Sequence, residues 1–277
     1  MAMRPRLLSL LAAPLLATAA TRQAETAAGL RPADWAERHA ALRSLSASPL
    51  QAADQELLAS FLRRPDQAGG DRRRLNQLRN EAAALLLRQP GREVPNAHLL
   101  LETLRTPGHD PVWRDYCVQF LGALLPRLEG WHRDGVIGRL LQLAGGDRDP
   151  IAATALVALA RQPRLPADAM RLLRQRALHL ANGDSIPPPL RVSAMAVCAR
   201  LSLDRALPAA RRLLDDEQAP VPVRLAGIGL LAQLGRADDR ARLRRLASHP
   251  DSRLRLAARR WLHRMSAPPR PPADAPR

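Results

Sequence analysis

The residue types that perform covalent or metal chemistry are few and scattered in this sequence. There are two cysteines, Cys117 and Cys198, and seven histidines, and none of them falls into a His-Glu-x-x-His or Cys-x-x-Cys arrangement. Zinc sites depend on such spacings, because they bring the ligands together on one helix face or one turn. No nucleophile–base pair or paired carboxylates stand out either. The sequence therefore predicts no metal, no cofactor and no catalytic residue.

Three short segments combine glycine, histidine and carboxylate side chains in ways that could serve a binding site. His109-Asp110 and His132-Arg133-Asp134 place an imidazole near a carboxylate, and Gly145-Gly146-Asp147 could let the backbone approach a cation or a phosphate. The last segment lacks the Gly-Lys-Ser or Gly-x-Gly-x-x-Gly context of phosphate-binding loops. All three occupy predicted turns, where glycine ends one helix and aspartate caps the next. We interpret them as structural.

Arginine is the other chemically distinctive residue. The formal net charge is +17, and all 43 basic residues are arginine because the chain contains no lysine. Ten arginines and three aspartates fall between Arg236 and Arg264. This segment has two interpretations. It is either a polar cap that ends a stack of repeats, or a surface for an anionic polymer or membrane headgroups, with steeply salt-dependent binding. In the second case Arg259, Arg260 and Arg264 are the binding residues.

Arginines also recur at regular intervals in front of apolar segments. The shared pattern is Arg-x-x-small-apolar-x-apolar-apolar-small, and its copies start 35, 38, 39, 33 and 31 residues apart. The copies start at Arg79, Arg114, Ala152, Arg191, Arg224 and Arg255, with alanine replacing arginine in the third. Such a period is typical of helical repeats, each of which buries its apolar face only against its neighbours. The sequence predicts an all-α fold, an α-solenoid of stacked antiparallel helical hairpins.

A second amphipathic segment lies between successive copies, with leucine at helical spacing. These segments are 135–143, 167–180, 205–214 and 238–247. In two repeats an aspartate stands four residues before the arginine. Asp110 and Asp251 are therefore expected to cap their helices and to pair with Arg114 and Arg255 across the first turn.

The arginine-led segments resemble the HEAT-repeat family, in which a second helix opens with aspartate or proline followed by Val-Arg and a small residue. The matching segments are Pro222-Val-Arg224-Leu-Ala, Asp251-Ser-Arg-Leu-Arg255-Leu-Ala-Ala and Asp110-Pro-Val-Trp-Arg114. The resemblance covers Asp71 to Met265. It implies a HEAT-like superhelix that binds other macromolecules and carries no catalytic residues of its own; the fold alone does not define the partner.

The repeat register also places the two cysteines. Cys117 lies three residues after its arginine and Cys198 seven after its own, with the whole Ala152 repeat between them. At roughly 10 Å per helix layer they would be about 20 Å apart, whereas a disulfide needs α-carbons within about 7 Å of each other. We expect two buried thiols.

Outside the repeats, both termini have distinct compositions. Residues 1–20 combine a basic start, a short apolar core and an Ala-x-Ala site, which is the layout of a secretory signal peptide cleaved near Ala19 or Ala20. The mature protein would be periplasmic or secreted. Residues 21–265 form the predicted solenoid, with an N-terminal capping hairpin at 33–64 and a C-terminal cap at 236–265. Residues 266–277 are a Pro-rich tail predicted to be disordered.

These features together predict a non-enzymatic exported scaffold that binds another protein on its solenoid surface. The polar residues expected to line that surface are Gln119, Arg161, Arg200 and Gln233. Two alternatives stay open. One is binding of an anionic polymer or membrane headgroups through the C-terminal arginines; the other is an enzyme similar to the HEAT-like lyases. Export disfavours nucleic acid as a partner.

Overall fold

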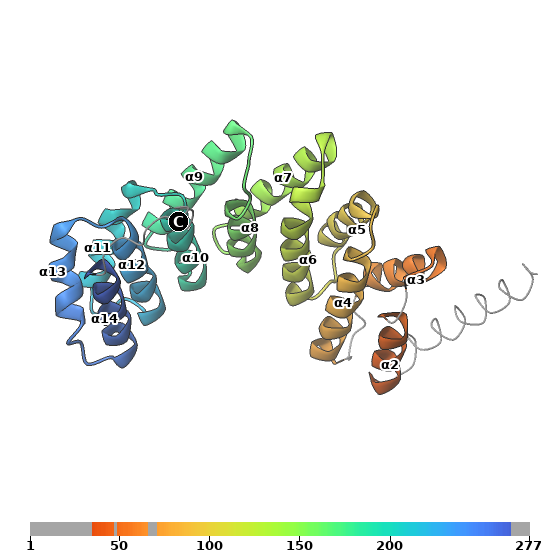
Figure 1. The fold of residues 1–277 in the computed structure, drawn as a ribbon, viewed down its shortest axis with the longest axis horizontal. Helices are drawn as coiled ribbons and strands as arrows, with labels where there is room; N and C mark the ends of the chain where they lie inside the picture. Colours follow the sequence, from red (N-terminus) through yellow and green to blue (C-terminus); the bar gives the residue numbers. More distant parts are fainter. Residues whose placement is uncertain (1–34, 47–48, 66–70, 267–277) are drawn as a thin grey trace, which may run out of the picture. The chain divides into compact units, whose positions relative to one another are not determined.

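The computed structural model describes residues 35–46, 49–65 and 71–266 (Figure 1), and for Ala237 and residues 264–266 it describes the backbone alone. The predicted signal peptide, including its cleavage site, and the predicted tail from residue 267 onward lie outside the described residues. So do residues 33 and 34, the first two of the predicted N-terminal capping hairpin. The described ranges contain helices and turns and no strand, which confirms the predicted all-α fold.

The helices fall into two compact units, which meet in sequence at Leu128 and Glu129. In unit 1 the helices are α2 (Trp35–Ser46), α3 (Ala52–Arg63), α4 (Arg72–Leu87), α5 (Glu93–Arg105), α6 (Pro111–Leu124) and the short 3₁₀ helix η1 (Leu125–Arg127). In unit 2 they are α7 (Gly130–Ala144), α8 (Pro150–Ala160), α9 (Ala167–Asn182), α10 (Pro188–Arg200), η2 (Asp204–Ala206), α11 (Leu207–Asp215), α12 (Val221–Leu234), α13 (Ala237–Leu246) and α14 (Ser252–Ser266).

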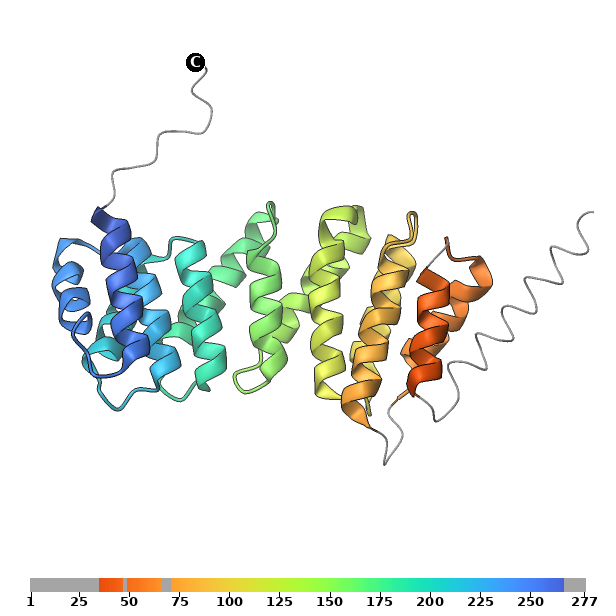
Figure 2. The same ribbon diagram turned by 60° about the horizontal axis from the view of Figure 1, so that its bottom comes forward.

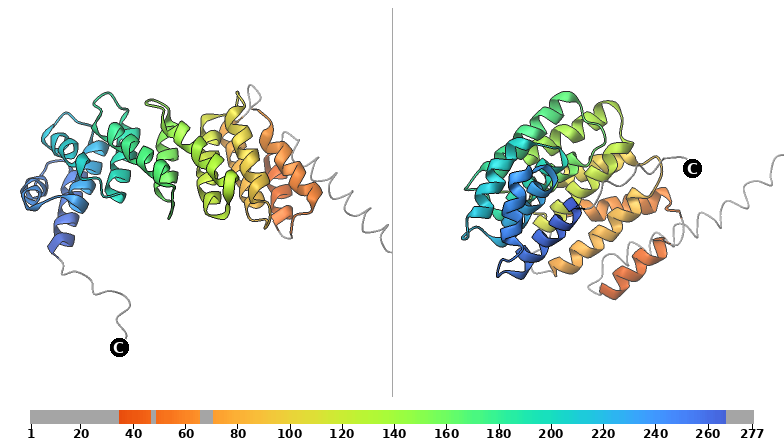
Figure 3. Two further views of the ribbon diagram at one scale, coloured as in Figure 1. Left: turned by 90° about the horizontal axis from the view of Figure 1, so that it is seen from above. Right: turned by 60° about the vertical axis from the view of Figure 1, so that its left-hand side comes forward.

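Within each unit, helices alternate between two layers. In unit 1, α4 packs against α2 and α6 in one layer, while α3 packs against α5 in the other. In unit 2, α8, α10, α12 and α14 pack in succession in one layer, and α7, α9, α11 and α13 each cover the helix that follows them. Figure 2 shows α10, α12 and α14 side by side, and Figure 3 shows the same stack from two other directions. Each unit is therefore a stack of antiparallel helical hairpins, as the repeat predicts.

Burial follows the repeat register. In every copy but the last, the residues three, four and seven positions after the leading residue are buried, because these positions share one helix face. In the last copy Ala258 is buried and Arg259 is exposed. The buried residues are Cys117, Val118 and Leu121 after Arg114; Ala155, Leu156 and Leu159 after Ala152; Ala194, Met195 and Cys198 after Arg191; and Gly227, Ile228 and Leu231 after Arg224. Both thiols are free and buried, as predicted. Burial raises the pKa of the Cys198 thiol to about 12 and also raises that of Cys117.

The leading arginines do not pair with the capping aspartates, so that part of the prediction is wrong. Asp110 accepts a hydrogen bond from the Val112 N–H, and Asp251 accepts from the Arg253 N–H, so both cap their helices as expected. Arg255 instead donates to the His249 and Pro250 carbonyl oxygens, and Asp251 pairs with the Arg253 side chain. Backbone acceptors compete with the aspartates: carbonyl oxygens at or after the end of the preceding helix lack intrahelical partners, and the guanidinium groups of Arg114 and Arg255 reach them.

The acceptor of the leading arginine is the C-terminal end of the helix before it. Arg114 Nη2 lies 3.5 Å from the Leu104 carbonyl oxygen, Arg191 Nε lies 3.2 Å from that of Ala181, and Arg224 Nη2 lies 3.5 Å from that of Leu214. The last carbonyls of a helix lack intrahelical partners and carry partial negative charge, so a guanidinium is favoured there. Arg79 follows the same rule by donating to the Arg64 carbonyl oxygen, after the last residue of α3.

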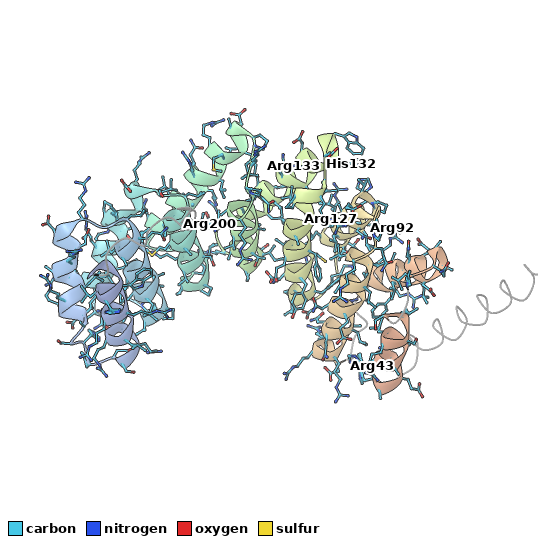
Figure 4. The ribbon with its side chains drawn as sticks, in the orientation of Figure 1. Arg43, Arg92, Arg127, His132, Arg133 and Arg200 are labelled. Carbon is cyan, nitrogen blue, oxygen red and sulfur yellow. The ribbon has the colours of Figure 1, made fainter. Side chains whose placement is uncertain are left out.

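Other arginines close helix ends in the same way. Arg127 Nη1 donates to the Leu87 carbonyl at the end of α4, and Arg200 Nε donates to the Ala160 carbonyl at the end of α8; Figure 4 labels both side chains. Arg176 donates to the Ala144 and Gly145 carbonyls and to Asp147, whose pKa it lowers. The Gly145–Asp147 segment is thus a tied turn between α7 and α8, as interpreted from the sequence.

A buried ion pair ties α11 to α13. Asp239 is 1% exposed and accepts from Arg211 Nε at 2.8 Å, from Arg211 Nη2 at 2.9 Å and from the Arg236 N–H at 2.9 Å. The hydrogen bonds from Arg211 are the main cause that lowers the pKa of Asp239 from its usual 3.8. Bidentate pairing fixes both side chains and joins neighbouring hairpins of unit 2.

Asp239→Asn should lower the free energy of unfolding by about 2 kcal/mol at pH 7, because Arg211 loses its charged partner. Since the folded-state pKa of Asp239 is depressed, this stabilisation is complete above the unfolded pKa of 3.8 and disappears as the pH falls through the lower folded value. Urea unfolding of both proteins at several pH values measures this difference in the free energy of unfolding. The exposed neighbour Asp238→Asn is the matched control and should change little; equal losses in the two variants would refute the role of the pair.

None of the described helices combines the length and the apolar composition that crossing a lipid bilayer requires.

Candidate functional site

The residues predicted to bind a protein partner are exposed and divide between the units. Gln119 lies on α6 in unit 1 and donates to Asp115 Oδ2. Arg161, Arg200 and Gln233 lie at or near the C-terminal ends of α8, α10 and α12, in one layer of unit 2. Arg200 is held by the Ala160 carbonyl, so one of these three side chains already has a structural role.

The three arginines of the predicted basic cluster on the last helix, Arg259, Arg260 and Arg264, differ in their surroundings. Arg259 and Arg260 are exposed, and Arg259 Nε donates to the Ala247 carbonyl at the end of α13. The side chain of Arg264 lies outside the described residues. Arg259 therefore closes a helix end, and Arg260 remains an exposed surface charge.

Unit 2 contains a cavity of about 470 Å³, which we call the Arg224 pocket. It lies where α11 ends, α12 begins, and α13 leads into the turn before α14. The charged and polar residues that line it are Arg224, Arg242, Arg245, His249, Asp215 and Glu217, and Leu214 and Leu246 complete the wall. Three guanidinium groups thus face two carboxylates and one imidazole.

Arg224 is the unusual member of this pocket. It is 4% exposed, its Nη2 reaches only the Leu214 carbonyl at 3.5 Å, and its Nε has no hydrogen-bond partner within the described ranges. No carboxylate of the described residues forms an ion pair with it. A buried charge with unmet donors is costly unless an anion compensates it. Arg191 occupies the equivalent slot in the preceding repeat and differs, because it pairs with Asp184 at 3.3 Å.

The other arginines of the pocket are positioned by Asp215. Arg242 Nη2 lies 3.1 Å from Asp215 Oδ2, and Arg245 Nη2 lies 3.7 Å from Asp215 Oδ1. Arg242 also approaches the buried Asp239, at 3.7 Å. Two cations therefore share one carboxylate at the pocket, which leaves donor capacity on the guanidinium groups for a further acceptor.

His249 adds a neutral donor. Its Nδ1 accepts a hydrogen bond from the Asp251 N–H at 3.0 Å. In the neutral ring the proton is then on Nε2, so that nitrogen is a donor. The His249 carbonyl is held by Arg255, so the turn that carries the ring is fixed. The pocket combines three guanidinium groups and an imidazole with two carboxylates, so its cations outnumber its anions by one. This excess of positive charge suits a phosphate or carboxylate group.

The sequence analysis singled out Arg224 as a repeat feature and did not recognise this pocket. The residues that complete it come from three segments whose proximity depends on how α11, α12 and α13 pack. The sequence carries no signal that separates the two repeats, because an acidic residue stands seven positions before each arginine, Asp184 before Arg191 and Glu217 before Arg224. Among the described residues, no group of three or more histidine, cysteine or acidic side chains could hold a metal ion.

Comparisons with known proteins add little to this geometry. No protein-family model and no curated protein sequence matches the chain, so the resemblance to the HEAT-repeat family stays a prediction. The solved structure of human deoxyhypusine hydroxylase in complex with glycerol is similar, with 19% sequence identity, a TM-score of 0.38, and coverage of 90% of this chain and 98% of that chain.

This match corrects two predictions. The sequence analysis predicted a non-enzymatic exported scaffold and no enzymatic activity, whereas the similar structure is that of an enzyme. Both predictions are therefore withdrawn as contradicted. At this level of identity and TM-score, the match transfers no activity, substrate or cofactor to this chain.

Because Nε of Arg224 lacks a hydrogen-bond partner among the described residues and Nε of Arg191 has one, replacing each arginine with methionine should change the free energy of unfolding by different amounts. Arg224→Met should change the free energy of unfolding by less than about 1 kcal/mol or raise it, because an apolar side chain of similar length replaces an uncompensated buried charge. Arg191→Met should cost about 2 kcal/mol, since Arg191 has a shorter hydrogen bond to its helix end, 3.2 Å against 3.5 Å, and its charge is paired with Asp184. Urea unfolding of both variants in phosphate-free buffer decides; a larger loss for Arg224→Met would contradict this account.

Proposed function

We propose that this protein binds an anionic ligand, one that carries a phosphate or carboxylate group, in the Arg224 pocket. The observation that carries the proposal is the buried guanidinium of Arg224, which lines the pocket and has an unpartnered Nε. A bound anion would supply the acceptor that the protein does not.

The other residues suit distinct parts of this task. Arg245 has a side chain that is 72% exposed, so it can attract an anion from solvent. Arg242 is held between Asp215 and Asp239, so it offers a donor at a fixed place. His249 contributes the Nε2–H, which can bond an oxygen without adding charge.

The net positive charge supports the same proposal at longer range. At +17, the chain attracts acidic partners whatever their identity. The ligand group could belong to a free small molecule or to an anionic polymer, since the recognised chemistry is the same. The proposal depends neither on which molecule carries the ligand group nor on the predicted export or the predicted lack of nucleic-acid binding.

Binding of inorganic phosphate tests the proposal. Isothermal titration of the full chain at low ionic strength should show saturable binding, and the affinity should fall as salt is added. Arg224→Met should weaken binding at least about tenfold, which corresponds to about 1.4 kcal/mol for one charged hydrogen-bond donor. Acetate in place of phosphate distinguishes a carboxylate preference.

Arg260→Met is the matched control, because Arg260 is exposed, lies on α14 and does not line the pocket. It should bind phosphate like the unmodified chain. Equal weakening by the two substitutions would mean that overall charge, and not the pocket, attracts the anion. Absence of binding of either anion at low salt would refute the proposed function.

A further inference from the structure

Unit 1 has a second cavity, of about 440 Å³, which we call the Asn76 pocket. It lies between α4 and the start of α6, two helices that pack side by side in one layer (Figure 2). Arg73, Asn76, Gln77 and Asn80 line it from one face of α4, since they are three or four residues apart. Asp110, Val112 and Tyr116 line it from α6 and its cap.

Asn76 gives the pocket a fixed hydrogen-bond acceptor. It is 5% exposed, and its Nδ2 donates to Asp110 Oδ1 at 2.8 Å. A carboxylate only accepts, so this bond fixes which end of the amide is nitrogen. The opposite end, Oδ1, is buried and has no hydrogen-bond partner in the part of the chain that the structure describes. A buried acceptor of this kind costs free energy until a donor reaches it.

Hydrogen-bond donors line the same pocket. Arg72 and Arg73 are exposed at the first turn of α4 and line the pocket. Arg72 Nη1 is 3.9 Å from Asp110 Oδ2. Asn80 adds an amide one turn further along, with both a donor and an acceptor. A ligand must therefore donate to Asn76 and accept from its neighbours over a short distance.

Two side chains give the pocket an apolar part. Val112 is 51% exposed, so its apolar side chain is accessible at the pocket. Tyr116 is the single tyrosine of a sequence with few aromatic residues. It combines an aromatic ring with a hydroxyl, so it can contact carbon atoms and still form a hydrogen bond.

We propose that the Asn76 pocket binds a carbohydrate residue. A sugar hydroxyl both donates and accepts, so neighbouring hydroxyls can donate to Asn76 Oδ1 and accept from Arg73 or Asn80. The C–H face of a sugar ring can lie against Val112 and Tyr116. An extended peptide fits less well, because it needs a groove that continues over several residues, and this cavity is bounded by residues of two helices. The site is independent of the Arg224 pocket, which lies in the other unit.

The test uses the full chain and a panel of methyl glycosides of glucose, galactose, mannose and N-acetylglucosamine, with binding followed by saturation-transfer NMR and isothermal titration. At least one glycoside should bind saturably. Asn76→Leu should weaken its binding at least about tenfold, because a buried acceptor is lost. Arg73→Met should weaken it several-fold without affecting folding, since Arg73 is exposed.

Gln119→Ala is the matched control: Gln119 lies on α6, is exposed and does not line the pocket, so the affinity should not change. Circular dichroism and urea unfolding establish that each variant folds, and Arg73→Met with Tyr116→Ala replaces Asn76→Leu if the latter unfolds. Failure of every glycoside to bind, or binding that Arg73→Met and Tyr116→Ala leave unchanged, overturns the proposal. Binding of a mixed-sequence peptide in place of any glycoside would also overturn it. Arg224→Met should leave glycoside binding unchanged, so this proposal and the proposed function can fail separately.

Discussion

The hydrogen bond from an arginine side chain to the C-terminal carbonyls of a neighbouring helix is the interaction on which both stacks depend. A short helix leaves its last four carbonyls unsatisfied, and a chain with many short helices repeats that problem many times. Carbonyl oxygens at the end of the preceding helix accept hydrogen bonds from the leading arginines Arg114, Arg191 and Arg224. Other helix ends in unit 2 accept from Arg176 and Arg200. A guanidinium suits the task because it has five donors in a rigid plane and keeps its charge.

The same interaction explains how a repeat position becomes a candidate site. Arg191 and Arg224 are equivalent in register, and both are buried. Asp184 compensates the first, whereas the second lines a cavity and keeps an unpartnered Nε. Because a buried charge is stable only with an anion or enough acceptors nearby, the arginine that lacks an ion pair among the described residues is the one for which we propose a bound anion. A repeat architecture allows such a change in one copy while the other copies keep the stack intact.

The Asn76 pocket follows a related logic with a neutral group. The N-cap Asp110 satisfies the backbone of α6 and also holds the amide nitrogen of Asn76, so the amide oxygen is left over. In both pockets a residue that lines the cavity has one buried hydrogen-bonding atom without a partner among the described residues.

The sequence by itself determined the helices, their alternation and the buried face of each repeat. The burial of positions three, four and seven in all copies but the last depends on helical periodicity, and the caps at Asp110 and Asp251 depend only on the first turn. Tertiary structure alone decided where the arginines reach and which polar atoms remain unpaired. Arg224 and Leu214 are ten residues apart, and Arg242 and Asp215 are 27 apart. Such contacts depend on the crossing and spacing of packed helices, which local patterns of residue type do not encode.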